Sequence, residues 1–381
     1  MMPTPNETSD VRTTLERYRD PIAGCRFCTM CKPAGDVANL TQIEGHTTRS
    51  RAMLLWRVLV GASRLEGRVA ELLYQSTLDG ISEAWCIEHY RVSDYLLAAR
   101  AQAYARGQAP PAVRAAVERP GPPAKVAEGD TVLLAGDVAE CGQADRVETL
   151  LRALAALNHD AAPAVMLSGA VAYALGAHEQ ATEQAHAVAD VVRASGATTV
   201  VCDGPQTLWA VTRVFPALGV DLPPDTRVTS VTELAATTSE ALERSHGGVG
   251  AFVHDSPYGY LITRASPERS VLLPGARTTG VRSGDDPSYR ALRRVVERAD
   301  MVQMESIWTR SLARSSGADA GLWLTYPVLA RGLAQARLDT AASLGAEAIV
   351  TDSLLDAIQF AACDDARVAV HWLPELLARS G

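Results

Sequence analysis

Two stretches of this chain, CRFCTMCKPAG (residues 25–35) and STLDGISEAWC (residues 76–86), carry four marked positions with the same spacing. In each stretch, two residues separate the first three positions from one another, and three residues separate the third position from the fourth. The first stretch keeps cysteine at its first three positions, and the second keeps cysteine only at its fourth. A random loss of cysteines would not be expected to sort the remaining thiols in this way.

This spacing is that of two-cluster ferredoxins, in which the fourth cysteine of each run ligates the cluster of the other run. One cluster would then be held by the positions that keep a thiol, and the other by positions that have lost it. Thiolates are the soft, anionic donors that such clusters require. We therefore predict one [4Fe–4S] cluster on Cys25, Cys28, Cys31 and Cys86, and no cluster on Gly35, Ser76, Asp79 and Ser82.

Zinc is the rival metal, because the first three cysteines could form a tetrahedron with either Cys86 or His89. A disulfide framework is disfavoured in a chain of this size without a secretory segment. The other cysteines lack ligand spacing, and the one that ends a predicted strand is most simply a core thiol. These three are Cys141, Cys202 and Cys363.

Composition narrows the class of protein. The 381 residues carry a net charge of −8 and show no basic patch interleaved with aromatic residues, which argues against a nucleic-acid partner. No apolar run reaches membrane-spanning length, and the first residues are polar. We expect a cytoplasmic protein without a membrane span, and peripheral association with a membrane partner remains open.

Apolar residues recur at helical spacing around the cysteine stretches, in residues 50–63, 64–74 and 93–107. In the first of these segments, the apolar residues available for a buried face are Met53, Leu54, Trp56, Val58, Leu59 and Val60. We expect a flexible tail over residues 1–16 and an α-helical ferredoxin-like iron–sulfur domain over residues 17–107. Prolines in residues 108–125 disfavour a long helix and indicate a semi-rigid linker.

The remainder of the chain alternates short β-branched runs with Ala-rich helical segments, which is typical of α/β units with parallel strands. DVVRASGATTVVCD (190–203) and DTAASLGAEAIVTD (339–352) also form a weak internal repeat. We therefore predict an α+α/β fold, in which the helical domain precedes a duplicated α/β domain with lobes at 126–245 and 246–381.

With these features the chain resembles the iron–sulfur subunits of the heterodisulfide-reductase, glycolate-oxidase and lactate-utilisation type. The resemblance rests on YRDPIAGCRFCTMCK, on LLYQSTLDGISEAWCIEHY and on the α/β part, where the family carries a Cys-Cys-Gly element in each lobe. The matching places here are MLSGA, with Leu167, Ser168 and Gly169, and RSSGADAG, with Ser315, Ser316 and Gly317. Both Cys-Cys-Gly repeats are therefore degenerate.

The departures from this family imply that the α/β lobes have lost a metal site. Hydroxyls are poor ligands for soft cluster iron, so serines at these positions would not hold a second cluster. The family's His-Asp-Pro-Cys element survives as His254 and Asp255 without its cysteine. We expect this pair to be a buried hydrogen-bonding device rather than a catalytic acid and base, and we predict no catalytic residue.

Two functions follow as hypotheses. The first is a non-catalytic electron-transfer subunit of an oxidoreductase complex, which passes single electrons from a flavoprotein dehydrogenase partner to an acceptor. The flavin is expected on the partner and not on this chain. The second is a structural subunit, whose single metal centre, [4Fe–4S] or zinc, only stabilises the fold. A self-sufficient reductase is disfavoured because no substrate-reducing centre remains.

Overall fold

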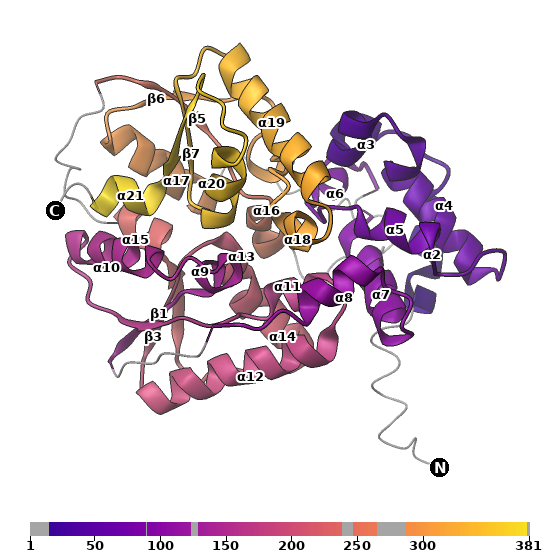
Figure 1. Cartoon of the computed structure of the whole chain (residues 1–381), viewed down its shortest axis with the longest axis horizontal. Coiled ribbons are helices and arrows are strands. Elements are labelled where there is room, and N and C mark those ends of the chain that lie inside the picture. The colour runs from indigo at the N-terminus through magenta and orange to yellow at the C-terminus, as the bar shows by residue number, and fades with distance from the viewer. Residues whose placement is uncertain (1–14, 89, 123–128, 238–246, 265–286, 379–381) are drawn as a thin grey trace.

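A computed structural model of the chain describes residues 15–88, 90–122, 129–237, 247–264 and 287–378. An N-terminal helical part packs against one end of two stacked α/β lobes (Figure 1). No helix in the described ranges is long and apolar enough to cross a bilayer.

The helical part consists of short helices joined by tight turns. The longest of them, α7, is buried along most of its length. The Thr47 hydroxyl begins α4 by accepting a hydrogen bond from the Ser50 amide. Its elements are η1 (Leu15–Tyr18), α2 (Arg19–Cys25), η2 (Lys32–Ala34), α3 (Asp36–Thr41), η3 (Glu44–His46), α4 (Thr48–Leu59), α5 (Arg68–Tyr74), α6 (Ile81–Trp85), α7 (Val92–Ala105) and α8 (Pro111–Val117).

Each lobe contains one four-stranded parallel sheet, and the two sheets have the same strand order. The first sheet runs β2-β1-β3-β4 and the second runs β6-β5-β7-β8, so each strand of the first has a counterpart in the second. Strand β7 is buried on all its residues, as expected for a parallel strand covered on both faces. The strands are β1 (Thr131–Leu134), β2 (Ala162–Ala164), β3 (Thr199–Cys202), β4 (Arg227–Ser230), β5 (Gly250–Val253), β6 (Val302–Met304), β7 (Ala348–Thr351) and β8 (Ala369–Trp372).

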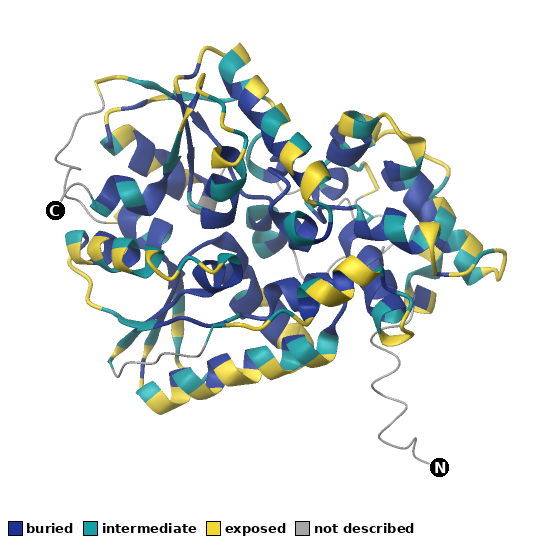
Figure 2. Cartoon of the chain, in the orientation of Figure 1, coloured by how far each residue is buried: buried dark blue, intermediate teal, exposed yellow. Residues whose placement is uncertain are grey.

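Helices cover both sheets, and the exposed residues of the lobes lie on the outer faces of these helices and in the turns between elements (Figure 2). Those of the first lobe are α9 (Gly136–Cys141), α10 (Arg146–Ala156), α11 (Ala170–Ala174), α12 (His178–Ser195), α13 (Pro205–Trp209), the π-turn η4 (Ala210–Val214), α14 (Phe215–Leu218) and α15 (Val231–Thr237). Those of the second lobe are α16 (Tyr258–Thr263), α17 (Pro287–Arg298), η6 (Arg310–Leu312), η7 (Asp319–Gly321), α18 (Leu322–Thr325), α19 (Pro327–Ser343), α20 (Leu354–Ala361) and α21 (Leu373–Ala378).

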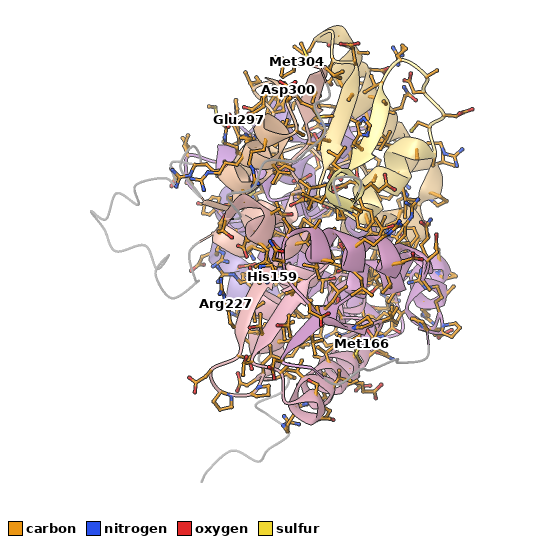
Figure 3. The ribbon with its side chains drawn as sticks, turned by 90° about the vertical axis from the view of Figure 1, so that its left-hand side faces the viewer. His159, Met166, Arg227, Glu297, Asp300 and Met304 are labelled. Carbon is orange, nitrogen blue, oxygen red and sulfur yellow. The ribbon has the colours of Figure 1, made fainter. Side chains whose placement is uncertain are left out.

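The lobes exchange their last helices. Helix α15 of the first lobe packs on α17 of the second, and α21 of the second packs on α10 of the first. The Arg298 guanidinium donates to the Ala235 carbonyl at 2.7 Å, and Arg146 pairs with Glu375. One apolar core runs through both lobes and includes Leu150 and Val295. Viewed from the side, Met304 marks the upper lobe and Arg227 the lower one (Figure 3).

The helical part is fastened to the first lobe by buried polar contacts. The Tyr74 hydroxyl donates to the carbonyls of Arg100 and Leu175, at 3.0 and 3.1 Å. The Arg100 guanidinium donates to the Ala174 carbonyl at 2.9 Å. A second apolar core is shared between these two parts of the chain, so α7 belongs to both.

The mixed class predicted from the sequence, helices followed by parallel α/β units, is confirmed. Three finer expectations differ from the structure. Leu15 is buried, so the predicted tail is wrong at its last two residues. The Pro-rich segment contains α8, because proline is tolerated in the first turn of a helix. In α4 the buried apolar residues are Ala52 and Leu55, and the expected Met53 and Val60 are exposed.

Candidate metal centre

Two short helices deliver the cysteines. Helix α2 ends at Cys25, and the turns that follow carry Cys28 and Cys31 up to η2. Helix α6 ends one residue before Cys86, which has extended backbone. Gly24 lies against the Tyr90 side chain, because a Cβ at this position would lie 2.1 Å from the Tyr90 hydroxyl.

The four thiols lie within electrostatic reach of one another. Burial raises the pKa of the Cys25 thiol to about 12, and Cys31, Cys86 and Cys28 each add to the increase. Burial also raises the pKa of Cys31, with further contributions from Cys86 and Cys28. The four cysteines that the sequence predicted as ligands are therefore near enough for their charges to interact, whereas Cys141, Cys202 and Cys363 lie in the α/β lobes.

These four side chains are of the type that an iron–sulfur cluster takes as ligands. All four are free cysteines, so the donor set consists of thiols alone. Among the described residues, no three His, Cys, Asp or Glu side chains are gathered so that they could hold a metal ion. The alternative zinc ligand His89 lies outside the described residues.

Polar groups lie close to three of the sulfurs. The Tyr95 hydroxyl donates to Cys25 Sγ at 3.1 Å, and the Met30 amide donates to Cys28 Sγ at 3.4 Å. Near the third sulfur, the Thr48 hydroxyl lowers the pKa of the Cys31 thiol against the larger effect of burial. Such donors stabilise negative charge on cluster sulfurs.

The four positions that lack thiols also come together, around a polar cavity of about 30 Å³. Because Gly35 comes from the first stretch and the other three positions from the second, this convergence has the crossed arrangement that the spacing predicted. Buried side chains fill the rest of the space, and a cavity of this volume holds about one water molecule rather than a cluster. The lining includes Gly35, Ser76, Asp79 and Ser82, together with Asp36, Thr48, Arg51 and Glu83.

At the degenerate Cys-Cys-Gly positions, the serine side chains form hydrogen bonds within the protein. The Ser315 hydroxyl donates to Asp319, and the Ser316 hydroxyl donates to Asp356. In the first lobe, Ser168 is fully buried. Its Cβ is one of the atoms that a side chain at Gly136 would meet, at 3.1 Å. The Ser168 hydroxyl accepts a hydrogen bond from the Ala170 amide at 3.4 Å, so each of the three serines has a polar partner within the protein.

His254 and Asp255 have different neighbours in the structure. Burial would raise the pKa of Asp255, but Arg293 donates to both carboxylate oxygens at 2.8 Å and holds the pKa below its usual value. His254 is fully buried and its Nε2 lies 3.6 Å from Asp356 Oδ2. Only Asp255 has the hydrogen bonds that we expected of this pair.

Sequence reasoning missed the residues that surround the sulfurs and the cavity. Tyr95, Thr48 and Asp36 reach the site from α7, α4 and α3, and none of them belongs to the cysteine spacing. Their only signal in the sequence is that Asp36 follows Gly35 directly.

Comparison with solved structures finds similarity to a crystal structure of a hypothetical protein from Helicobacter pylori. The TM-score is 0.52 at 12% sequence identity, and the match covers 96% of this chain and 75% of that one. No protein-family model and no curated protein matches the chain. At this identity the likeness extends to the fold alone, which is shared along nearly the whole of the present chain.

Proposed function

We propose that the chain is an iron–sulfur electron-transfer subunit of an oxidoreductase complex, of the heterodisulfide-reductase and lactate-utilisation type that its motifs resemble. The observation that carries this proposal is the convergence of four free thiols from two separate stretches, with Cys28 exposed at the surface. A [4Fe–4S] cluster bound there would accept and release one electron at a time.

The chain's own residues would set the properties of such a site. Cys25 is buried while Cys28 is exposed, so one side of the site is shielded from water and the other faces a partner. Donors from Tyr95, Thr48 and the Met30 amide would stabilise the more negative state.

An exposed apolar surface next to the cysteines supports docking of a partner. Phe27, Met30 and Ile87 are 74%, 53% and 67% exposed, and each lies within two residues of a cysteine. Small apolar patches of this kind suit transient electron-transfer encounters. Residues 17–107 carry twelve Lys and Arg against nine Asp and Glu, a net charge of +3 in a chain of −8. This asymmetry favours an acidic partner surface.

We assign the partner as a flavoprotein dehydrogenase, because the resemblance implies one. Serines that are hydrogen-bonded to carboxylates stand at the degenerate positions, so we assign the α/β lobes to docking of the partner rather than to a second redox centre. We place the complex in the cytoplasm, where thiols remain reduced.

The test uses the complex formed with a candidate flavoprotein under anaerobic conditions. Substrate should reduce the flavin in both the native complex and a Cys28→Ser complex, but only the native complex should pass electrons to an external acceptor. Cys363→Ser is the matched control, because this cysteine lies away from the four-thiol site and should leave transfer unchanged. Acceptor turnover that survives in the Cys28→Ser complex would contradict electron transfer.

The second candidate is a structural subunit whose metal centre only holds the helical part together. The hydrogen-bonded serines and carboxylates at the degenerate positions favour it, since they show how this fold closes without metal there. The colour and metal content of anaerobically purified protein separate the two: a colourless zinc protein supports the structural role.

A further inference from the structure

We propose that the polar cavity at the four lost ligand positions takes up one proton when the neighbouring four-thiol site gains an electron. This function rests on the proposed electron-transfer role and adds a proton to it. Proton uptake would give a function to the cavity at the four positions that lack thiols.

The first step of the argument is the direct connection between cavity and cysteines. The Thr48 and Ser82 hydroxyls are 2.7 Å apart and both line the cavity. Thr48 also lies close enough to the Cys31 thiol to lower its pKa. One hydrogen bond between two buried hydroxyls therefore connects the cavity wall with the surroundings of a predicted ligand.

The proton acceptor is a pair of carboxyls that line the cavity, the buried Asp36 and the half-buried Asp79. Asp79 is held by the Thr77 hydroxyl at 2.5 Å and the Ile81 amide at 3.0 Å, and Asp36 Oδ2 accepts from the Ser315 amide at 2.7 Å. Among the described residues, Asp36 Oδ1 has no hydrogen-bond partner, although Arg314 Nε lies 3.3 Å away. This free oxygen belongs to a residue that lines the cavity and is more than nine-tenths buried.

The charges around this pair are nearly balanced, so one added charge can decide its protonation. The side chains that face it come from α3, α4, α6, α19 and the segment before α18. On η2 and η3, Lys32 pairs with Glu44, and His46 binds Thr41 and Gln75 instead. The charged neighbours of the pair are Arg51, Glu83, Arg314, Asp319 and Arg337.

Electrostatics agrees with this geometry. Burial raises the pKa of Asp36 to about 8, and the Asp79 carboxylate contributes to the increase. Burial also raises the pKa of Asp79. Two interacting carboxyls of this kind titrate together, so their proton uptake belongs to the pair rather than to either residue.

The step is balanced in charge. An electron passed from the partner's reduced flavin to a cluster held by Cys25, Cys28, Cys31 and Cys86 would add one negative charge there. One carboxylate of the pair takes one proton from water and becomes a carboxylic acid, and no other bond is made or broken. Arg314, whose side chain is 25% exposed beside Asp36, marks the side on which the pair approaches solvent.

The test is the midpoint potential of the iron-loaded protein between pH 6 and 9. In native protein the potential should fall with rising pH over part of this range, approaching 59 mV for each tenfold change in proton activity. Asp36→Asn and Asp79→Asn should each flatten this dependence, and Thr48→Val should weaken it. Asp20→Asn removes one exposed carboxylate from α2 and should leave the slope unchanged.

A second readout does not require a metal. The carbonyl stretch of a protonated carboxyl in the infrared spectrum should be present at pH 7 and reduced in Asp36→Asn. A pH-independent potential in iron-loaded native protein would overturn the proton uptake and leave the electron-transfer role standing. Protein that binds no iron would overturn the electron-transfer role itself, together with the coupling built on it.

Discussion

In the proposed crossed ligation, Cys86 connects the two cysteine stretches, because it comes from one and would share a cluster with three thiols of the other. We expect Cys86→Ala to lose bound iron as completely as Cys28→Ala, from about four irons per chain to less than one. Iron and sulfide analysis of anaerobically prepared protein measures this, with Cys363→Ala as the control. A count near eight irons in native protein, or a full spectrum in Cys86→Ala, would contradict the single crossed site.

Asp352 gives a pH dependence that is independent of any metal. Burial raises its pKa to about 7, while the Thr232 hydroxyl, which donates at 3.0 Å, lowers it. A carboxyl whose pKa is higher in the folded state stabilises the fold below about pH 4, and this stabilisation is lost as pH rises through about 7.

Asp352→Asn should therefore gain stability relative to native protein between pH 5 and pH 8, on the order of 2 kcal/mol. Urea unfolding at the two pH values gives the difference. The exposed Asp221→Asn serves as control, and an equal effect of both substitutions at both pH values would be the wrong outcome for this prediction.

At the residue scale, the sequence could single out the four cysteines as candidate ligands, because their spacing matches that of cluster ligands. It could not predict Thr48, Tyr95 or Asp36, since each reaches the site from another helix through tertiary packing. The same limit explains the Ser315–Asp319 and Ser316–Asp356 contacts, where loss of cysteine is visible in sequence but the new partner is not.

At the scale of elements, the Ser-Gly turns fix how close a helix lies to each sheet. Gly317 has φ +85°, and a Cβ there would lie 2.4 Å from the Ala330 carbonyl oxygen on α19. Gly345 has φ +78°, but a Cβ at this position would have no neighbouring atom within 4 Å. An alanine at either position would strain the backbone. Only at Gly317 would the added side chain also push α19 away from the turn.

Gly317→Ala should cost about 2–4 kcal/mol of unfolding free energy, from the left-handed backbone and the steric clash together. Gly345→Ala should cost only about 1–2 kcal/mol, because the backbone effect acts alone. Urea denaturation measures both. Equal losses would mean that α19 moves freely away from the turn, contrary to the packing described.

Element types followed from local sequence wherever the apolar pattern was strong, as in β1, β3 and β7. Helix faces followed less well. Arg51 in α4 is buried because it donates to the carbonyls of Leu72 and Gln75, which no periodic pattern of apolar residues could indicate. With Arg51 buried, Met53 and Val60 lie at the surface instead.

At the scale of the whole molecule, the internal repeat foreshadowed two lobes, and the identical strand orders agree with it. The exchange of α15 and α21 between the lobes was not visible in the sequence, because it depends on long-range packing. The same is true of the core shared by α7 and the first lobe, which changes how metal loss should spread through the molecule.

Removal of the metal should loosen only the outer part of the helical region. A metal held by the proposed ligands would supply folding free energy to the turns that carry them, from Phe27 to Gly35 and around Cys86. Helix α7 has a second attachment, since Arg100 and Tyr74 bind carbonyls of the first lobe and Gly176 packs against the Arg100 backbone. Local opening should therefore stop at α7.

Hydrogen exchange with and without a chelator measures this directly. We expect amides of residues 27–35 and 81–86 to exchange at least tenfold faster after metal removal, while those of α7 and the distant α12 change little. Arg100→Met removes the attachment of α7 to the lobe but keeps an apolar side chain of similar reach. In that variant the faster exchange should extend into α7. Opening of the lobes before the cysteine turns, in either protein, would show that the metal centre does not stabilise this region.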